Sequence, residues 1–200
     1  MRGQARSADP ALLGLAAFVV SQLLLNIPNA HLVPEAATML SLTTLVATGG
    51  LVQVLCAIFE FSRGNTFGTT TFGFYGSFFL ALGGFLLLQQ LSVLEFGVAE
   101  DAAFGTFLLV WGLFTLGITV IAFRENPVLG TMFVLISGSF VGGALHYLTG
   151  LDSGFGGWSG IASAAVGAYI VFRGLWSATA PPQPEPDPVV EGVPVQVTAR

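Results

Sequence analysis

The sequence predicts an all-α integral membrane protein with six transmembrane helices and both termini in the cytoplasm. Of its 200 residues, 54% are hydrophobic and only 8% are charged, whereas soluble domains carry about 25% charged residues. Six apolar runs approach the ~20 residues that a spanning helix needs; they cover residues 10–27, 36–59, 71–90, 103–123, 128–149 and 157–176.

All six basic residues are arginines, and they lie in the tails, in even-numbered connections or at the end of the last run: Arg2, Arg6, Arg63, Arg124, Arg173 and Arg200. Because basic residues near spans stay on the cytoplasmic side, this distribution places both termini there.

The first run begins at a strong helix start. Asp9 precedes Pro10; a carboxylate caps free backbone N–H groups, and proline is tolerated at the first helical position. We expect this helix to end around residues 26–28, where Pro28 interrupts the hydrogen-bond ladder. No small-residue cleavage signal stands before Pro28, so we interpret the run as a retained span and not as a signal peptide.

The start of the third run is the most informative stretch. Residues 64–79 read GNTFGTTTFGFYGSFF and contain no charge. Glycines let helix backbones approach closely, hydroxyls offer hydrogen bonds and aromatic rings narrow a passage. We expect Gly64 and Gly68 to turn the chain at the cytoplasmic side, and Tyr75 to lie inside the third span. This composition predicts the lining of a pore.

The remaining segments organise the rest of the chain. The connection at 91–102 is acidic and is expected outside the cell, and 124–127 is expected to form a tight internal turn. The GxxxG pattern at 138–142 permits close helix packing, either within the chain or with a second copy. Residues 1–9 are predicted as a cytoplasmic N-terminal segment and 10–176 as the transmembrane domain. The proline-rich residues 177–200 are predicted as a disordered cytoplasmic tail.

Composition excludes several classes of function. The net charge of −5 and the absence of lysine leave no basic patch for nucleic acid. Cys56 is the only cysteine, so neither a disulfide nor a cysteine metal cluster is available. His31 and His146 are interpreted as packed or interfacial histidines and not as metal ligands. No nucleophile, base and acid occur in a catalytic pattern, so we expect no enzyme, no cofactor and no metal.

Several uncharged polar residues lie within the predicted spans. Gln53 lies near the middle of the second run and must face other helices or water, since an unpaired amide is costly in hydrocarbon. Asn26 and Asn29 either offer amide N–H groups to a carboxylate or cap the end of the first helix. Thr70 and Thr71 either bond a passing carboxylate or bond their own helix backbone.

Glu60 lies near the cytoplasmic end of the second run, close to Arg63. An ion pair or a role at the helix end is the simpler interpretation. A proton-linked role in transport is the alternative.

Six segments resemble the signatures of one membrane protein family, in the family's order and at fitting spacing. They are DPALLGL at 9–15, LLLNIPNA at 23–30, FEFSRGNTFG at 59–68, YGSFF at 75–79, WGLFTL at 111–116 and GW at 157–158. The family is the acetate uptake transporter family, also called succinate-acetate permeases of the YaaH type. The first segment resembles its NPAPLGL signature, which matches here at Pro10, Ala11, Leu13, Gly14 and Leu15. Asp9, Leu12 and Phe79 depart from the family's asparagine, proline and tryptophan; Asp9 either remains a helix cap or alters how the substrate enters.

The resemblance implies a fold, a gate and an assembly. A pore would run through the bundle of each protomer, and the protomers would form a homohexamer in the plasma membrane. The family's hydrophobic constriction maps onto Phe18, Tyr75 and Ile136, and its pore glutamine maps onto Gln53. The implied function is passage of acetate, succinate or another short carboxylate through this narrow pore.

Two other functions remain open at this point. Six-helix oligomeric pores lined by threonines and aromatics also suit a small neutral solute such as urea or ammonia. A membrane sensor or interaction protein is the third reading, in which the proline-rich tail recruits a cytoplasmic partner.

Overall fold

The computed structural model describes residues 8–34 and 38–180 of the chain. The described part is helical: α1 Pro10–Asn29, α2 Thr38–Thr44, the π-helix η2 Leu45–Val52, α3 Gln53–Ser62, α4 Thr66–Gln90, the 3-10 turn η3 Gly97–Ala99, α5 Glu100–Glu125, α6 Pro127–Thr149 and α7 Gly154–Ala178. Within these residues six segments are long and apolar enough to cross a membrane, with α2, η2 and α3 together supplying the second. The predicted all-α, six-span fold is confirmed. Most of the predicted N-terminal segment and tail lies outside the described residues.

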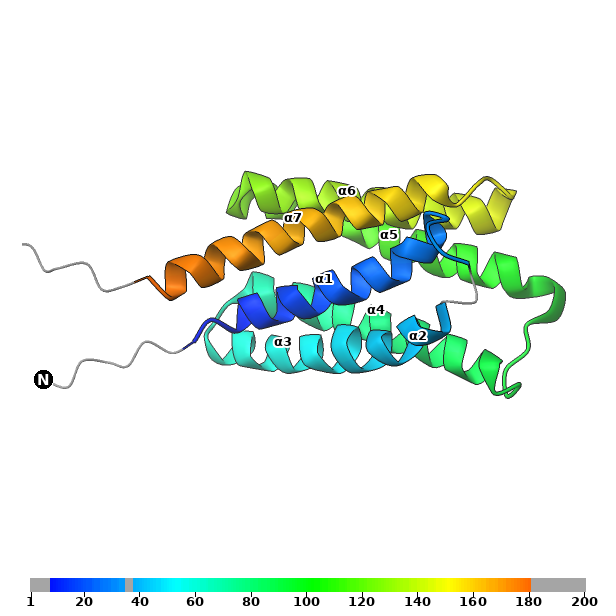
Figure 1. The fold of residues 1–200 in the computed structure, drawn as a ribbon, viewed down its shortest axis with the longest axis horizontal. Helices are drawn as coiled ribbons and strands as arrows, with labels where there is room; N and C mark the ends of the chain where they lie inside the picture. The colour runs from blue at the N-terminus through cyan, green and yellow to red at the C-terminus, as the bar shows by residue number, and fades with distance from the viewer. Residues whose placement is uncertain (1–7, 35–37, 181–200) are drawn as a thin grey trace, which may run out of the picture.

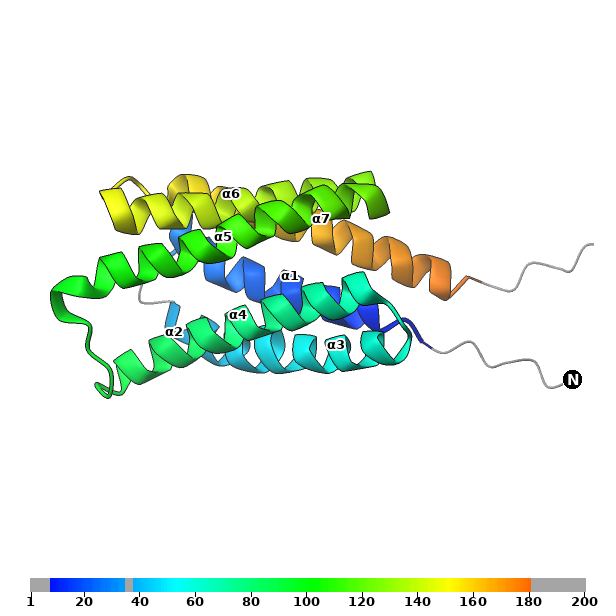
Figure 2. The same ribbon diagram turned by 180° about the vertical axis from the view of Figure 1, so that it is seen from behind.

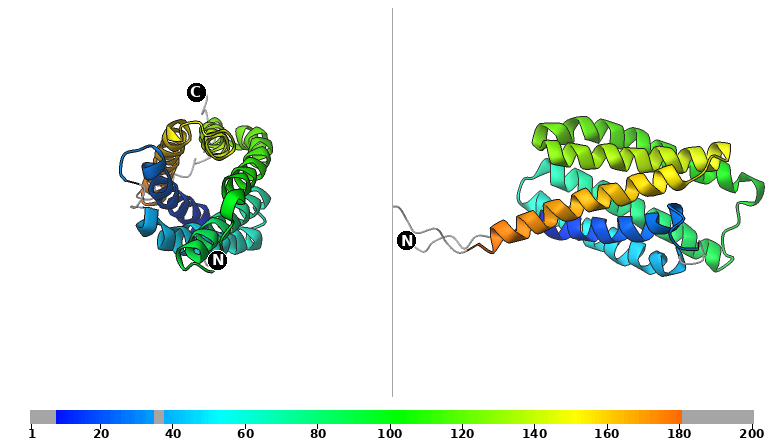
Figure 3. Two further views of the ribbon diagram at one scale, coloured as in Figure 1. Left: turned by 90° about the vertical axis from the view of Figure 1, so that its right-hand side faces the viewer. Right: turned by 45° about the horizontal axis from the view of Figure 1, so that its top comes forward.

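The six spans form a ring around a central axis, which is visible end-on in the left view of Figure 3. Going round the ring, α1 packs between α7 and the η2–α3 segment, α3 packs on α4, and α5, α6 and α7 pack in chain order. Figure 1 shows the start of α1 and the end of α7 at the same end of the bundle. This is the arrangement that an even number of spans requires; the assignment of that end to the cytoplasm stays a prediction.

Two helix starts are capped by side chains, the predicted cap at Asp9 and a further one at Asn126 in the expected turn. The Asp9 carboxylate accepts a hydrogen bond from the Ala11 amide, and Pro10 follows at the first helical position. The Asn126 side chain accepts from the Val128 and Leu129 amides, so this residue ends α5 and begins α6 without a loop between them. The departure of Asp9 from the family asparagine is therefore compatible with helix capping, which needs only an acceptor.

Two predicted helix boundaries are wrong. Helix α1 continues through Pro28 to Asn29, close to its end, where the lost hydrogen bond costs little. Helix α4 begins at Thr66 and not at residue 71, because the Asn65 side chain accepts from the Gly68 amide and caps it. Gly64 makes the turn with a φ of +73°, a left-handed conformation that glycine adopts without strain, whereas Gly68 lies inside the helix.

The second span contains a feature that the sequence did not predict. Its middle, Leu45–Val52, is wound as a π-helix. An added Cβ at Gly49 would lie 2.7 Å from both the Phe79 ring and the Ser21 hydroxyl. Only a glycine at this position therefore lets the π-helix pack this closely against α1 and α4. Gln53 follows directly and donates from its side chain to the Gly49 carbonyl. π-Helical turns frequently lie at functional sites.

Helices α4 and α5 meet through aromatic side chains. Figure 2 shows α5 crossing the side of the bundle between α6 and α4. The ring of Phe74 lies 4.2 Å from that of Trp111 and 4.7 Å from that of Phe114, and Phe78 stacks on Phe107 at 5.6 Å. Such pairs add about 0.5–1.5 kcal/mol each beyond burial. This aromatic seam closes the ring.

The GxxxG pattern packs within the chain. A Cβ at Gly138 would collide with the Ser159 hydroxyl, and one at Gly142 would collide with the backbone of Gly156. Both contacts join α6 to α7. The alternative left open by the sequence, packing against a second copy, is therefore not needed to explain this pattern.

Gly142→Ala is expected to destabilise the bundle by about 1–3 kcal/mol, because the added methyl meets backbone that cannot give way. Gly117→Ala is the matched control, since the site on α5 has open space around an added Cβ; it should be neutral or stabilise by up to ~1 kcal/mol. Thermal unfolding of the two purified variants in detergent measures the difference. Equal unfolding temperatures would contradict the close packing of α6 on α7.

Candidate functional site

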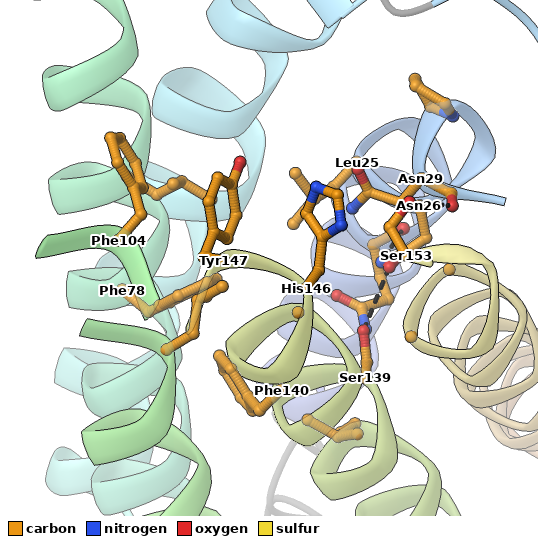
Figure 4. Close-up of a pocket in the computed structure, with 18 of the residues that line it drawn as sticks. Leu25, Asn26, Asn29, Phe78, Phe104, Ser139, Phe140, His146, Tyr147 and Ser153 are labelled. Carbon is orange, nitrogen blue, oxygen red and sulfur yellow. Dashed lines mark hydrogen bonds between the residues drawn. The ribbon is translucent and has the colours of Figure 1, made fainter. Parts of the chain in front are cut away.

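A cavity of about 340 Å³ opens into the bundle. It lies at the end opposite the start of α1 and the end of α7. Five helices contribute to its wall, and Figure 4 shows the side chains that face it. The lining residues come from α1, α4, α5, α6, the following loop and α7: Gln22, Leu25, Asn26, Pro28, Asn29, Phe78, Leu82, Leu86, Phe104, Leu108, Ile136, Ser139, Phe140, Gly143, His146, Tyr147, Ser153, Gly156 and Gly157.

One wall of the cavity is polar and held in place by hydrogen bonds. Asn26 donates to the Gln22 carbonyl at 2.8 Å and accepts from the Ser139 hydroxyl at 3.0 Å. Gln22 in turn donates to the Ser163 hydroxyl at 3.3 Å. Gly160 makes room for the Asn26 side chain, since a Cβ there would collide with it. The amide of Asn26 is thus fixed by groups from three helices.

The floor of the cavity is an aromatic layer. Phe78 packs edge-on against Phe140 with ring centroids 5.0 Å apart. One turn nearer the termini, the ring of Tyr75 lies 5.9 Å from that of Phe18 and 5.8 Å from that of Phe133. Phe18 and Tyr75 are each 4% exposed. These buried rings are in contact with one another at the level just below the cavity.

A buried hydrogen bond fixes the position of Tyr75. Its hydroxyl donates to the Thr115 hydroxyl at 3.0 Å, and Thr115 donates onward to the Trp111 carbonyl at 2.8 Å. Thr115 has no exposed surface. The ring therefore cannot swing away from Phe18 without leaving a buried hydroxyl unpaired, which costs roughly 1–3 kcal/mol.

The structure brings most of the predicted gate and amide residues to one region. Phe18 and Tyr75 are in contact, and Ile136, 2% exposed, lies in the cavity floor. Asn26 and Asn29 both line the cavity. Their roles in transport stay predictions, but their placement agrees with them.

The other predicted polar residues lie elsewhere. Gln53 and Thr71 are buried and donate to carbonyls of their own span, at Gly49 and Phe67. Neither lines the cavity, and Thr70 is exposed on α4. For Thr71 the backbone-bonding alternative is therefore realised in this conformation.

Sequence reasoning missed several residues of the site. Phe78, Phe133 and Phe140 belong to the aromatic layer, and Thr115 anchors it. A phenylalanine in a span carries no signal that separates a lipid contact from a gate, so only the positions of neighbouring helices identify these. His146, interpreted from the sequence as packed or interfacial, lines the cavity.

At the opposite end of the bundle a buried carboxylate lies among polar partners. Glu60 is 1% exposed; its Oε2 accepts from the Asn65 amide at 2.6 Å, and its Oε1 has no hydrogen-bond partner. Arg63 lies 3.6 Å from Oε1 and 2.7 Å from the Asp9 carboxylate. This cluster ties α1, α3 and the start of α4 together near the termini.

The rim of the cavity is joined by a second polar cluster. The His31 imidazole lies 2.9 Å from the Asp152 carboxylate, and Ser153 donates to the Asn29 carbonyl at 3.0 Å. The Gly154 amide, together with His31, holds the pKa of the Asp152 carboxyl below its usual range. These contacts connect the end of α1 to the loop between α6 and α7.

Comparison with known proteins gives consistent matches. The sequence profile of the GPR1/FUN34/yaaH family matches residues 2–182. The succinate-acetate/proton symporter SatP of Escherichia coli (strain K12) is 32% identical over 171 residues, which cover 84% of this chain and 88% of the symporter. The ammonia transport outward protein 2 of Saccharomyces cerevisiae is 28% identical over 175 residues, covering 84% of this chain and 61% of that protein. The solved structure of the bacterial acetate channel SatP aligns with a TM-score of 0.79 at 30% identity, covering 87% of this chain and 96% of that chain.

Asn65→Ala is expected to destabilise the protein more than Asn126→Ala. Asn126 only caps a helix, a role worth about 0.5–2 kcal/mol. Asn65 also donates to a buried carboxylate, and leaving such a group unpaired adds roughly 1–3 kcal/mol or more. The unfolding temperatures of the two variants measure this difference in stability. If Asn126→Ala unfolds at the same or a lower temperature than Asn65→Ala, the bond from Asn65 to the carboxylate adds nothing beyond the cap.

Proposed function

The chain belongs to the GPR1/FUN34/yaaH family, and on that premise we propose that it is a transporter or channel for acetate and related short-chain carboxylates, with succinate as a further substrate. The family resemblance expected from the sequence motifs is confirmed. The named relatives are transporters and a channel, which agrees with the expectation that the chain is not an enzyme. The observation that carries the proposal is the cavity with its fixed amide wall and aromatic floor.

The chemistry of the cavity suits a small carboxylate that must leave again. None of the described residues lining it is a lysine or arginine. A carboxylate there would be held by amide and hydroxyl groups and not by a full opposite charge. Passage requires binding that is favourable enough for capture and weak enough for release. The apolar wall of Phe104, Leu108 and Phe140 would accommodate the methyl or methylene part of the acid.

The aromatic layer is proposed as the gate between the cavity and the other side of the membrane. Opening requires Phe18 and Tyr75 to separate, and Ile136 contributes the aliphatic part of the same constriction. The burial of these three side chains, each at most 4% exposed, supports a closed constriction in this conformation.

The membrane arrangement extends the proposal. We place both termini in the cytoplasm, which puts the cavity on the outer face of the plasma membrane, and we expect the chain to assemble as a homohexamer with one pore in each protomer. The arginine distribution supports the orientation. The proton-linked role of Glu60 stays a prediction, in which Oε1, which lies 3.6 Å from Arg63 and has no hydrogen bond, would carry the proton.

Ammonia is the second candidate substrate, because one relative is named as an ammonia transporter. Uptake of radiolabelled acetate into proteoliposomes containing the purified chain separates the two. We expect saturable acetate uptake that other short-chain acids inhibit and urea does not. Flux of ammonia without flux of acetate would overturn the carboxylate proposal.

Phe18→Ala and Tyr75→Ala should each widen the constriction and raise acetate flux or admit larger acids, because each removes a ring from the closed layer. Leu13→Ala is the matched control: the residue lies on the same helix as Phe18 but is 55% exposed on the outer surface. Initial uptake rates for acetate and a longer acid measure the effect. Rates and selectivity equal to those of the Leu13→Ala variant would remove both residues from the gate.

A further inference from the structure

We propose that His146 is a carboxyl-binding residue of the cavity, with Nε2 of its imidazole as the atom that meets the carboxyl group of the transported acid. The inference rests on the proposed function and deepens it, since it names a contact for the substrate. The ligand class is a short-chain carboxylic acid, taken either as the neutral acid or as the carboxylate.

The position of His146 supports this contact. It lies in the last turn of α6, and Figure 4 shows its ring within the cavity, between the aromatic rings of Phe104 and Tyr147 and the amides of Asn26 and Asn29. An acid that enters from the rim meets the imidazole before it reaches the aromatic floor. The carboxyl group of the acid would therefore contact the polar wall of the cavity, and its apolar part would contact the aromatic wall.

The hydrogen bonding of the ring decides which nitrogen is available. Nδ1 lies 2.7 Å from the Leu151 carbonyl oxygen. A carbonyl oxygen only accepts, so Nδ1 carries the hydrogen and donates it. Among the described residues Nε2 has no corresponding hydrogen-bond partner. Leu151 thereby holds the ring in one tautomer with Nε2 left for a ligand.

This tautomer can bind either form of the acid with the same total number of protons. A neutral imidazole accepts at Nε2 from the O–H of a protonated acid. A protonated imidazole donates from Nε2 to a carboxylate. The two arrangements differ by transfer of one proton between the carboxyl oxygen and Nε2, and no other bond forms or breaks. The site therefore captures one acid together with one proton.

The charged groups near the ring lie at the rim of the cavity. His146 itself lies in the last turn of α6. The charged group that acts on it from the neighbouring loop is Asp152, which itself pairs with His31. The lining residues that face it from α1, α5 and α7 are uncharged; Tyr147 is its neighbour on α6.

The test uses two substitutions of His146, each of which keeps a polar group near only one of the two ring nitrogens. His146→Asn keeps an amide near the position of Nδ1, so it retains a donor for Leu151 but has nothing at Nε2. His146→Gln places an amide near Nε2 instead. His31→Asn is the control, because this histidine lies at the rim and does not line the cavity. The measurement is the KM and maximal rate of acetate uptake in proteoliposomes, across the pH range of histidine titration, about pH 5 to 8.

His146→Asn should raise KM roughly tenfold, which corresponds to loss of a hydrogen bond to a charged group, and should change the slope of KM against pH. At each pH the speciation of acetate is the same for every variant, so a difference in slope between variants reports the protein. His31→Asn should keep the wild-type KM and the wild-type slope of KM against pH. If His146→Asn does not fold, His146→Gln carries the test, because it also cannot take up a proton and should show the same change in slope.

The result that overturns the inference is a KM and pH slope equal to the wild type in the folded variant, or a raised KM with the wild-type slope. Either leaves acetate transport by the family fold intact. Absence of acetate uptake by the wild-type protein itself would overturn the proposed function, and this inference with it.

Discussion

The interior of the bundle depends on the placement of one side chain, Tyr75. Its ring packs on Phe18 of α1 and Phe133 of α6, and its hydroxyl donates to Thr115 of α5. Four spans are thus joined at one level of the membrane. The hydrogen bond matters because the hydroxyl is buried where no water can replace its partner. If this layer is the proposed gate, several contacts must be broken together to open it.

Around this layer, most buried polar side chains lie where they have a hydrogen-bond partner. Gln22 donates across helices to Ser163, and Asn26 accepts across helices from Ser139. Both amides line the cavity, where a carboxyl group would meet a prearranged wall. Within the described residues two buried oxygens have no hydrogen bond, the Ser21 hydroxyl and Oε1 of Glu60. Ser21 lies where the π-helical turn brings Gly49 close to α1, and Glu60 lies at the far end of the bundle. Unpaired polar atoms in a membrane protein mark places where the structure serves function more than stability.

The sequence predicted the number of spans, the cap at Asp9, the turn at residues 124–127 and the pairing of Phe18 with Tyr75, because each has a local or family signal. It misplaced the start of α4 by five residues, since the cap by Asn65 depends on one side-chain conformation. The π-helix of Leu45–Val52 could not be predicted, because its composition is that of any apolar span. His146 was predicted to be packed or interfacial. Its place in the cavity depends on α1 and α5, which are distant in sequence, while the nearby Leu151 carbonyl orients its ring.

The central claim, that the aromatic layer separates the cavity from the opposite side, is tested most directly by cysteine accessibility. Ser139→Cys lies in the cavity wall, Thr71→Cys lies one turn beyond Tyr75, and the native Cys56 is fully buried and supplies the background. A membrane-impermeant thiol reagent is added to the face opposite the termini. The account predicts rapid labelling at residue 139, and labelling at residue 71 only when Tyr75→Ala is also present. Equal labelling at residues 139 and 71 with Tyr75 intact would contradict it.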